Sequence, residues 1–312
     1  MSDSVLVIGS GLMGCGIGAV AALAGRKVIL TDRNEEIAQR GIGTAIDCIK
    51  ELTDNGLAGP EQAEQAKALL SATADLAAAC ESADLVIAAI VENLPVKQAL
   101  FCQLDSLLPV TVPILSKTSG LRITDISAGM QHPERTLTSH FWFPAHLVPL
   151  VEVVIGDHSD PAFAEPVRDE LKRWGKAPVI VRKDLPGQLA NRILQAIIRE
   201  AVNIVEIGLA TPEDVDTAVK MGMGIRFPVW GPLEHIEAVG LDLGYNVQKT
   251  VLPGISGRTD PSPVLKEMVD RGDLGYKTGK GFYDWTVKDM DALANRRNRF
   301  IIEARKFMKE NP

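Results

Sequence analysis

The sequence has few cysteines and no cluster of metal-ligand residues. Its 312 residues include four cysteines and five histidines. A disulfide-rich secreted scaffold would hold more cysteine, so we expect buried, reduced thiols. The histidines outside the site discussed below show no metal-ligand spacing and are interpreted as loop or surface residues. No metal site is expected. The residues concerned are Cys15, Cys48, Cys80 and Cys102, and His132, His146, His158 and His235.

The sequence also lacks an excess of positive charge and a long hydrophobic run. Lysine and arginine number 33 against 40 aspartates and glutamates, which gives a net charge of -7. This balance disfavours nucleic acid and anionic membranes as partners. The longest apolar stretches, such as the one within Ala83–Val91, are too short to span a membrane. A strand begins almost at the N-terminus, before any signal-peptide pattern, so we expect a cytoplasmic protein.

The first half of the chain alternates short β-branched runs with helical segments. This pattern is typical of a parallel sheet with helices on both faces. Between residues 34 and 70 it predicts two helices in a hairpin around the turn Asp54–Pro60, an insertion relative to a minimal β–α–β unit. The predicted strands are Val5–Ile8, Lys27–Thr31, Leu85–Ile90, Ile114–Ser116, Thr136–Phe141, Val151–Ile155 and Pro178–Val181.

The second part of the chain is predicted to be helical. From Gln188 to Leu209 apolar side chains recur every three or four positions, which predicts one long amphipathic helix. The sequence therefore predicts a domain of residues 1–183 and a helical domain of residues 184–312. Further helices are expected at Pro212–Met221, Pro232–Val239 and Pro263–Arg271, and near Lys288–Lys309.

A glycine-rich turn follows the first predicted strand. Its sequence, Gly9-Ser10-Gly11-Leu12-Met13-Gly14, fits G-x-G-x-x-G and opens a helix of small residues. In this setting the glycines allow a tight turn and a close approach of the backbone to a pyrophosphate, and the first amides of the helix bind the phosphates. We predict an α/β fold, with a Rossmann-type doubly wound sheet followed by the all-helical domain. The predicted dinucleotide contacts in this turn are Gly9, Gly11, Leu12, Met13 and Gly14.

Asp32 ends the next predicted strand, about 20 residues further on. A carboxylate at this place binds the ribose hydroxyls and repels the 2′-phosphate of NADP, so NAD is the predicted cofactor. The neighbouring Arg33 leaves two roles open, because a guanidinium would either accept that phosphate or stack on adenine.

Several further segments occur in an order that resembles the 3-hydroxyacyl-CoA dehydrogenase family, over nearly the whole chain. The segments are ADLVIAAIVENLPVKQALFCQLD, LSKTSGLRIT, HFWFPAHLVPLVEVV, KAPVIVRKDLPGQLANRIL and LGYKTGKGFYDW. The resemblance implies an NAD domain, then a helical domain that forms a homodimer interface. It also implies the roles of individual residues. The catalytic set would be His140 as base, Glu152 as its carboxylate partner, Ser119 and Asn191, and the residues beside the cofactor would include Glu92, Lys97 and Ser119.

The chemistry of dehydrogenation gives His140 and Glu152 the same roles. Oxidation of a secondary alcohol needs a base for the hydroxyl proton while a hydride leaves for the nicotinamide, and an imidazole suits that task near pH 7. A carboxylate on the other ring nitrogen holds the tautomer and stabilises the imidazolium. His140 ends one predicted strand and Glu152 lies near the start of the next, so we expect neighbouring strand ends to bring them face to face.

Three departures from the family pattern concern the substrate. Phe143 replaces the asparagine of the H-x-x-N-P element, Lys117 replaces the first amide of N-T-S-S, and the segment around Arg226 is longer than usual. The longer segment resembles the lambda-crystallin/L-gulonate dehydrogenase branch and similar enzymes that act on free acids. Arg226 would clamp a substrate carboxylate with two hydrogen bonds; alternatively it would cap a helix or pair with a nearby glutamate. We treat Lys117, Phe143 and Arg226 as candidate substrate residues.

Three functions remain open. The first is an NAD-dependent dehydrogenase that reversibly oxidises the 3-hydroxyl of a small free hydroxy acid to a ketone. The second is a short-chain (S)-3-hydroxyacyl-CoA dehydrogenase, although the hairpin offers the CoA phosphates only Arg40, Lys50 and Lys67 among more numerous acidic residues. The third is a non-catalytic, NAD-binding structural protein. The His140–Glu152–Asn191 set disfavours this third hypothesis, because binding alone needs no base.

Overall fold

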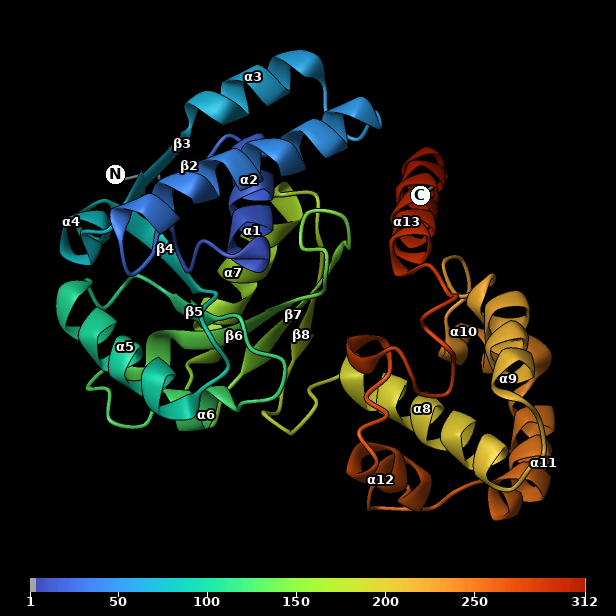
Figure 1. Ribbon diagram of the computed structural model, residues 1–312. Helices are drawn as coiled ribbons and strands as arrows, with labels where there is room; N and C mark the ends of the chain where they lie inside the picture. Colours follow the sequence, from blue (N-terminus) through green and yellow to red (C-terminus); the bar gives the residue numbers. More distant parts are fainter. Residues whose placement is uncertain (1–3, 312) are drawn as a thin grey trace. The chain divides into compact units, whose positions relative to one another are not determined.

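The computed structural model describes residues 4–311 and contains two compact units (Figure 1). The first unit ends at Ala190 and the second begins at Asn191. The first is an α/β unit and the second consists of helices. The predicted fold class is therefore confirmed: a doubly wound sheet is followed by a helical domain.

The first unit is built on an eight-stranded sheet with the strand order β3-β2-β1-β4-β5-β6-β7-β8. All neighbouring strands from β3 to β6 are parallel, whereas β7 runs antiparallel to β6 and β8 runs parallel to β7. The expectation of a parallel sheet thus holds for its larger part only. The strands are β1 (Ser4–Ile8), β2 (Lys27–Thr31), β3 (Leu70–Thr73), β4 (Ala83–Ala88), β5 (Ile114–Ser116), β6 (Thr136–Phe141), β7 (Leu150–Ile155) and β8 (Ala177–Val181).

Helices cover both faces of this sheet (Figure 1). The predicted hairpin is confirmed: Asn34 caps α2 by accepting a hydrogen bond from the Ile37 amide, and Pro60 stands at the start of α3. Elsewhere on the sheet, Phe101 and Leu104 of α5 pack in one buried cluster with residues of β1, β4 and β5. The helices are α1 (Leu12–Leu23), α2 (Glu35–Asp54), α3 (Pro60–Ala68), α4 (Leu76–Glu81), α5 (Leu94–Leu107), α6 (Ile123–Ile126) and α7 (Ala164–Arg173).

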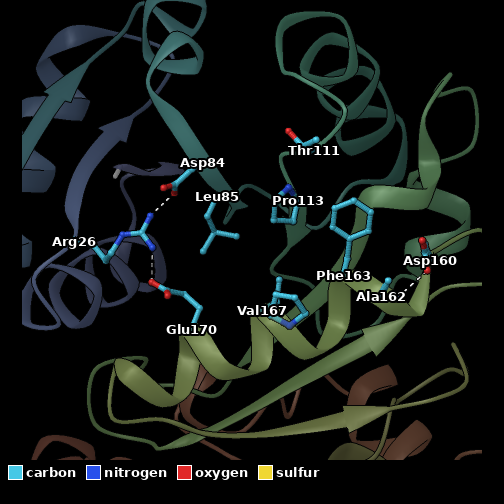
Figure 2. Close-up of a pocket in the computed structure, with 11 residues that line it drawn as sticks. Arg26, Asp84, Leu85, Thr111, Pro113, Asp160, Ala162, Phe163, Val167 and Glu170 are labelled. Atoms are coloured by element: carbon cyan, nitrogen blue, oxygen red, sulfur yellow. Dashed lines mark hydrogen bonds and ion pairs between the residues drawn. The ribbon is translucent and has the colours of Figure 1, made fainter. Parts of the chain in front are cut away.

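An arginine joins three elements at the edge of the sheet where β2 and β4 begin. Arg26, between α1 and β2, donates to Glu170 of α7 at 2.5 Å and also pairs with Asp84 of β4. Figure 2 shows both contacts beside a hollow of about 590 Å³ whose other walls include Leu85, Phe163 and Val167. Because parallel α/β sheets place their ligands at the opposite, carboxyl ends of the strands, this cluster is separate from the candidate active site.

The second unit comprises six α-helices and a π-helical turn at Val219–Gly224. Helix α8 begins at Ala190, two residues after the predicted start, and α11 was not predicted. Gly244 of α11 allows close packing on α10, since an added Cβ would lie 2.5 Å from Cγ1 of Ile236. Within residues 4–311 no helix is long and apolar enough to cross a membrane. The helices are α8 (Ala190–Glu206), α9 (Pro212–Ala218), α10 (Pro232–Val239), α11 (Leu241–Val251), α12 (Pro263–Asp270) and α13 (Met290–Glu310).

Candidate active site

His140 and Glu152 face each other on adjacent strands. They are directly paired in the antiparallel register of β6 and β7, so their side chains lie on the same face of the sheet. Nδ1 of His140 is 2.6 Å from Oε2 of Glu152. Both residues are buried, with His140 4% and Glu152 0% exposed. The expected juxtaposition of the two side chains is present in the structure.

Three further hydrogen bonds hold the Glu152 carboxylate. The Trp142 indole donates to Oε2 at 3.1 Å, and the backbone amides of Leu189 and Ala190 each donate to Oε1 at 2.9 Å. Burial alone would raise the pKa of Glu152, but the bonds from His140, the two amides and Trp142 outweigh it and lower the pKa to about 2. The carboxylate therefore stays ionised at any pH where the protein would work.

An ionised Glu152 determines which nitrogen of His140 can act as a base. A carboxylate only accepts hydrogen bonds, so the neutral imidazole must carry its proton on Nδ1. The lone pair is then on Nε2, which is free to accept a proton. Sequence reasoning did not find the amides of Leu189 and Ala190, because backbone donors leave no residue signature. The Trp142 indole was missed as well, although its spacing of two from His140 places both side chains on one face of an extended segment.

The glycine-rich turn is shaped for close approach. Gly9 has φ +103° and a Cβ there would lie 2.6 Å from the Ala89 carbonyl oxygen, while a Cβ on Gly14 would lie 1.8 Å from the Gly9 oxygen. At Gly11, in contrast, an added Cβ would meet no heavy atom within 4 Å. Helix α1 begins at the next residue, Leu12, which is 69% exposed and is followed by the half-buried Met13. The turn thus leaves open space in front of the first amides of α1, where a phosphate would bind.

Asp32 lies at the rim of this space. Its carboxylate accepts from the Ser10 amide at 2.7 Å and the Arg33 amide at 2.8 Å, which orients it beside the turn. An adjoining groove of about 790 Å³ is lined by Gly9, Gly11, Asp32, Arg33 and Arg40 among others. The open turn, the helix start and the oriented carboxylate together fit a dinucleotide with free ribose hydroxyls.

Glu92 organises the loop that follows β5. Its Oε1 accepts from the amides of Ser119 and Gly120 at 3.1 Å each and from the hydroxyl of Thr118. Burial would raise the pKa of Glu92, but the bond from Thr118, the charge of Lys97 and the two amides together lower it. Glu92 is therefore an anion that holds Ser119 in place.

Lys97 is buried beneath this loop. Its side chain is 0% exposed, and Nζ lies 3.3 Å from the Lys117 carbonyl oxygen, 3.5 Å from Oγ of Ser116 and 3.6 Å from the Glu92 carboxylate. Burial lowers the pKa of the Lys97 ammonium against the opposing effect of Glu92. The structure thus connects Lys97 to Glu92, and its direct contact with the cofactor stays a prediction.

The candidate substrate residues and Asn191 are divided between the two units. Nζ of Lys117 is 3.4 Å from Oγ of Ser119, and burial lowers the pKa of Lys117 although Glu92 opposes it. Phe143, in the loop after β6, is 54% exposed. Asn191 and Arg226 belong to the second unit, Asn191 in the first turn of α8 and Arg226 just after the π-helical turn, where its Nε donates to the Gly222 oxygen at 3.2 Å.

His146 lies in a loop, as one of its two interpretations held, but it is not a surface residue. Its side chain is buried, and Nε2 is 2.7 Å from Oε2 of Glu51, which attaches the loop between β6 and β7 to α2. Sequence spacing could not show this because the two residues are far apart along the chain. Over the described chain, residues 4–311, no group of three or more His, Cys, Asp or Glu side chains could hold a metal ion.

Comparison with known proteins places this site in context. The chain matches the model of the 3-hydroxyacyl-CoA dehydrogenase NAD-binding domain over residues 4–185 and that of the C-terminal domain over residues 187–285. It is 32% identical over 309 residues to 5-formyl-3-hydroxy-2-methylpyridine 4-carboxylate 5-dehydrogenase of Mesorhizobium japonicum, covering 99% of both chains. It is 39% identical over 292 residues to the mitochondrial hydroxyacyl-coenzyme A dehydrogenase of Mus musculus, covering 90% of each.

Solved structures of similar enzymes superpose on this chain. A crystal structure of the pyridine carboxylic acid 5-dehydrogenase, described as an NAD+-dependent dismutase, superposes with a TM-score of 0.90 at 32% identity and covers 99% of both chains. The (S)-3-hydroxybutyryl-CoA dehydrogenase of Ralstonia eutropha superposes with a TM-score of 0.76 at 30% identity, covering 91% of this chain and 99% of that one.

Proposed function

Because this chain belongs to the 3-hydroxyacyl-CoA dehydrogenase family and is an NAD-dependent oxidoreductase of CH–OH donors, we propose that His140 is the base of its reaction. The observation that carries this assignment is the 2.6 Å contact between Nδ1 of His140 and a fully buried, ionised Glu152. The contact leaves Nε2 as the proton acceptor.

The residues of the chain would share the work as follows. Gly9, Gly11, Gly14 and Asp32 would hold NAD, which would supply the hydride acceptor. Nε2 of His140 takes the hydroxyl proton, and Glu152 stabilises the positive ring that forms without accepting a proton itself. Ser119 and Asn191 would donate hydrogen bonds to the substrate oxygen as it becomes a carbonyl. In the reverse direction His140 returns the proton to the ketone.

Substitution of His140 tests this assignment. His140→Gln should lower kcat by roughly 10²- to 10⁴-fold, the usual contribution of a general base, while the Kd for NAD, measured by calorimetry, stays within about twofold of the wild type. The matched control is His132→Gln, which removes a surface histidine 3.3 Å from Glu134 and should leave kcat unchanged. Near wild-type turnover in the His140 variant would exclude it as the base.

We propose a small free hydroxy acid as the substrate. Two of the three hairpin cations already pair with carboxylates, Lys50 with Asp54 and Lys67 with Glu64, which leaves little positive charge for CoA phosphates. The match that covers 99% of both chains includes α13, beyond the C-terminal family model, and that relative is named for a pyridine carboxylate. The alternative, a short-chain 3-hydroxyacyl-CoA, is favoured by the higher identity to hydroxyacyl-coenzyme A dehydrogenase.

A comparison of substrates separates the two. Reduction of free acetoacetate and a panel of aliphatic and aromatic keto or aldehyde acids by NADH should exceed that of acetoacetyl-CoA by at least about tenfold in kcat/KM, a difference of about 1.4 kcal/mol in transition-state binding. Arg226→Ala should raise KM for the free acid, whereas the control Arg168→Ala on α7 should not. Turnover of the thioester alone, with no response to the Arg226 variant, would remove the free-acid proposal.

We also propose a cytoplasmic homodimer formed through the second unit. Apolar side chains of α8, including Ile193, Leu194 and Ile198, are exposed in the single chain and would be covered by a second copy. All four cysteines are free, which suits a reducing compartment. A monomeric mass of 33.6 kDa by light scattering at micromolar concentration would exclude the dimer.

A further inference from the structure

Gln188 has a backbone conformation that residues with a Cβ rarely adopt. Its φ is +51°, the only positive value at a non-glycine position within residues 4–311, and the preceding Gly187 has φ +79°. Its amide closes a turn by donating to the Leu185 oxygen at 3.0 Å. Left-handed conformations at such residues persist where the surroundings impose them, often at functional sites.

This turn determines where the next two amides point. The N–H groups of Leu189 and Ala190 both donate to Oε1 of Glu152, each at 2.9 Å. Successive amides converge on one anion where the backbone passes through a left-handed or turn conformation. The conformation of Gln188 is therefore required for two of the four hydrogen bonds that hold the Glu152 carboxylate.

The Gln188 side chain attaches the same turn to the loop that carries Ser119. Gln188 is 6% exposed, and its Nε2 donates to the Thr118 carbonyl oxygen at 3.2 Å. The opposite amide orientation would place two carbonyl oxygens against each other, so the nitrogen must face Thr118. Within the described chain Oε1 of Gln188 has no hydrogen-bond partner.

We infer that Gln188 is a positioning residue that couples the two halves of the site. Its backbone aims two amides at Glu152, and its side chain fastens them to Thr118, whose hydroxyl binds Glu92 on the cofactor side. The loop that carries Ser119 and the Glu152 carboxylate that supports His140 are thereby held in a fixed relative position. This inference rests on the proposed function to the extent that His140 is the base.

The variant Gln188→Glu tests the coupling because it keeps the shape of the side chain but faces the Thr118 carbonyl with a carboxylate oxygen. We expect kcat to fall roughly 10- to 100-fold, the effect of a small misplacement of reacting groups, with the Kd for NAD within twofold of the wild type. We also expect the low-field proton NMR signal of the His140 Nδ1–H, identified by its loss in His140→Gln, to broaden or shift without any substrate present.

Two comparisons make the result decisive. Gln98→Glu breaks a bond of the same type, from Nε2 to the Asp125 oxygen at 2.8 Å, and should change neither kcat nor the signal. Gln188→Gly adopts the left-handed turn without strain. It removes the side chain with its bond to Thr118 but places no carboxylate against the Thr118 carbonyl, so it should show a smaller loss. Should both folded Gln188 variants keep the wild-type kcat and signal, the inference is overturned. Failure of the proposed function would appear differently, as a His140→Gln variant that is fully active.

Discussion

At the scale of single residues, Asp32 combines two tasks on one carboxylate. It accepts hydrogen bonds from the amides of Ser10 and Arg33, and it borders the groove where the adenosine ribose would lie. Arg33 and Arg40 line the same groove. We therefore predict that the negative charge of Asp32 favours NAD, while the two guanidinium groups would favour a 2′-phosphate in its absence.

Removal of that charge should therefore change the choice of cofactor. Asp32→Asn keeps an acceptor for the Ser10 amide and should lower kcat/KM with NAD by about 10-fold or more, whereas kcat/KM with NADP should rise, since the repulsion of the 2′-phosphate is gone. Steady-state kinetics with both cofactors measure the ratio. An unchanged ratio in a folded variant would mean that Asp32 does not select NAD.

At the scale of secondary-structure elements, the sequence predicted most of the framework and missed what depends on packing. The strands that carry the turn, Asp32, His140 and Glu152 were predicted because β-branched runs between turn residues are a local signal. Strand β3 (Leu-Ser-Ala-Thr) was missed, since it is short and lies at the edge of the sheet. Helix α11 was missed because Gly240 directly precedes it and Gly244 interrupts its pattern, although Gly244 allows the close contact with Ile236.

The candidate site was predicted to a similar extent: its two reactive side chains were identified from the sequence, but the backbone donors around them were not. His140 and Glu152 have side chains whose chemistry is visible in the sequence, and the neighbouring strand ends indicated that they would meet. The amides of Leu189 and Ala190 depend on a left-handed turn at Gln188, for which a glutamine gives no warning. That turn also explains why α8 begins two residues later than its apolar periodicity predicted.

At the scale of the whole molecule, Glu152 links the active site to stability in acid. The pKa of Glu152 is about 2 in the folded state, against 4.5 as an ordinary glutamate. Its contribution to folding is fully present above pH 4.5 and is lost as the pH falls towards 2, because the folded state must then bind a proton that the unfolded state already holds. From this difference the contribution is on the order of 3 kcal/mol.

Glu152→Gln should accordingly be less stable than the wild type at pH 6, and the gap in unfolding free energy should narrow as the pH falls from about 4.5 to 2. Urea unfolding at a series of pH values measures the gap. Glu213→Gln, on the exposed start of α9, is the matched control and should be close to the wild type at pH 6. A gap for Glu152 that stayed constant down to pH 2 would contradict the ionised carboxylate.

The loop between the antiparallel strands β6 and β7 has a consequence for the evolution of new substrate specificities. Ala145, His146 and Leu147 anchor it in the protein interior, while Phe143 protrudes. We expect substitutions of Phe143, a candidate substrate residue, to leave these three buried anchors in place and to alter substrate specificity. Related enzymes with this loop would then differ in substrate specificity through the substitution of a single side chain.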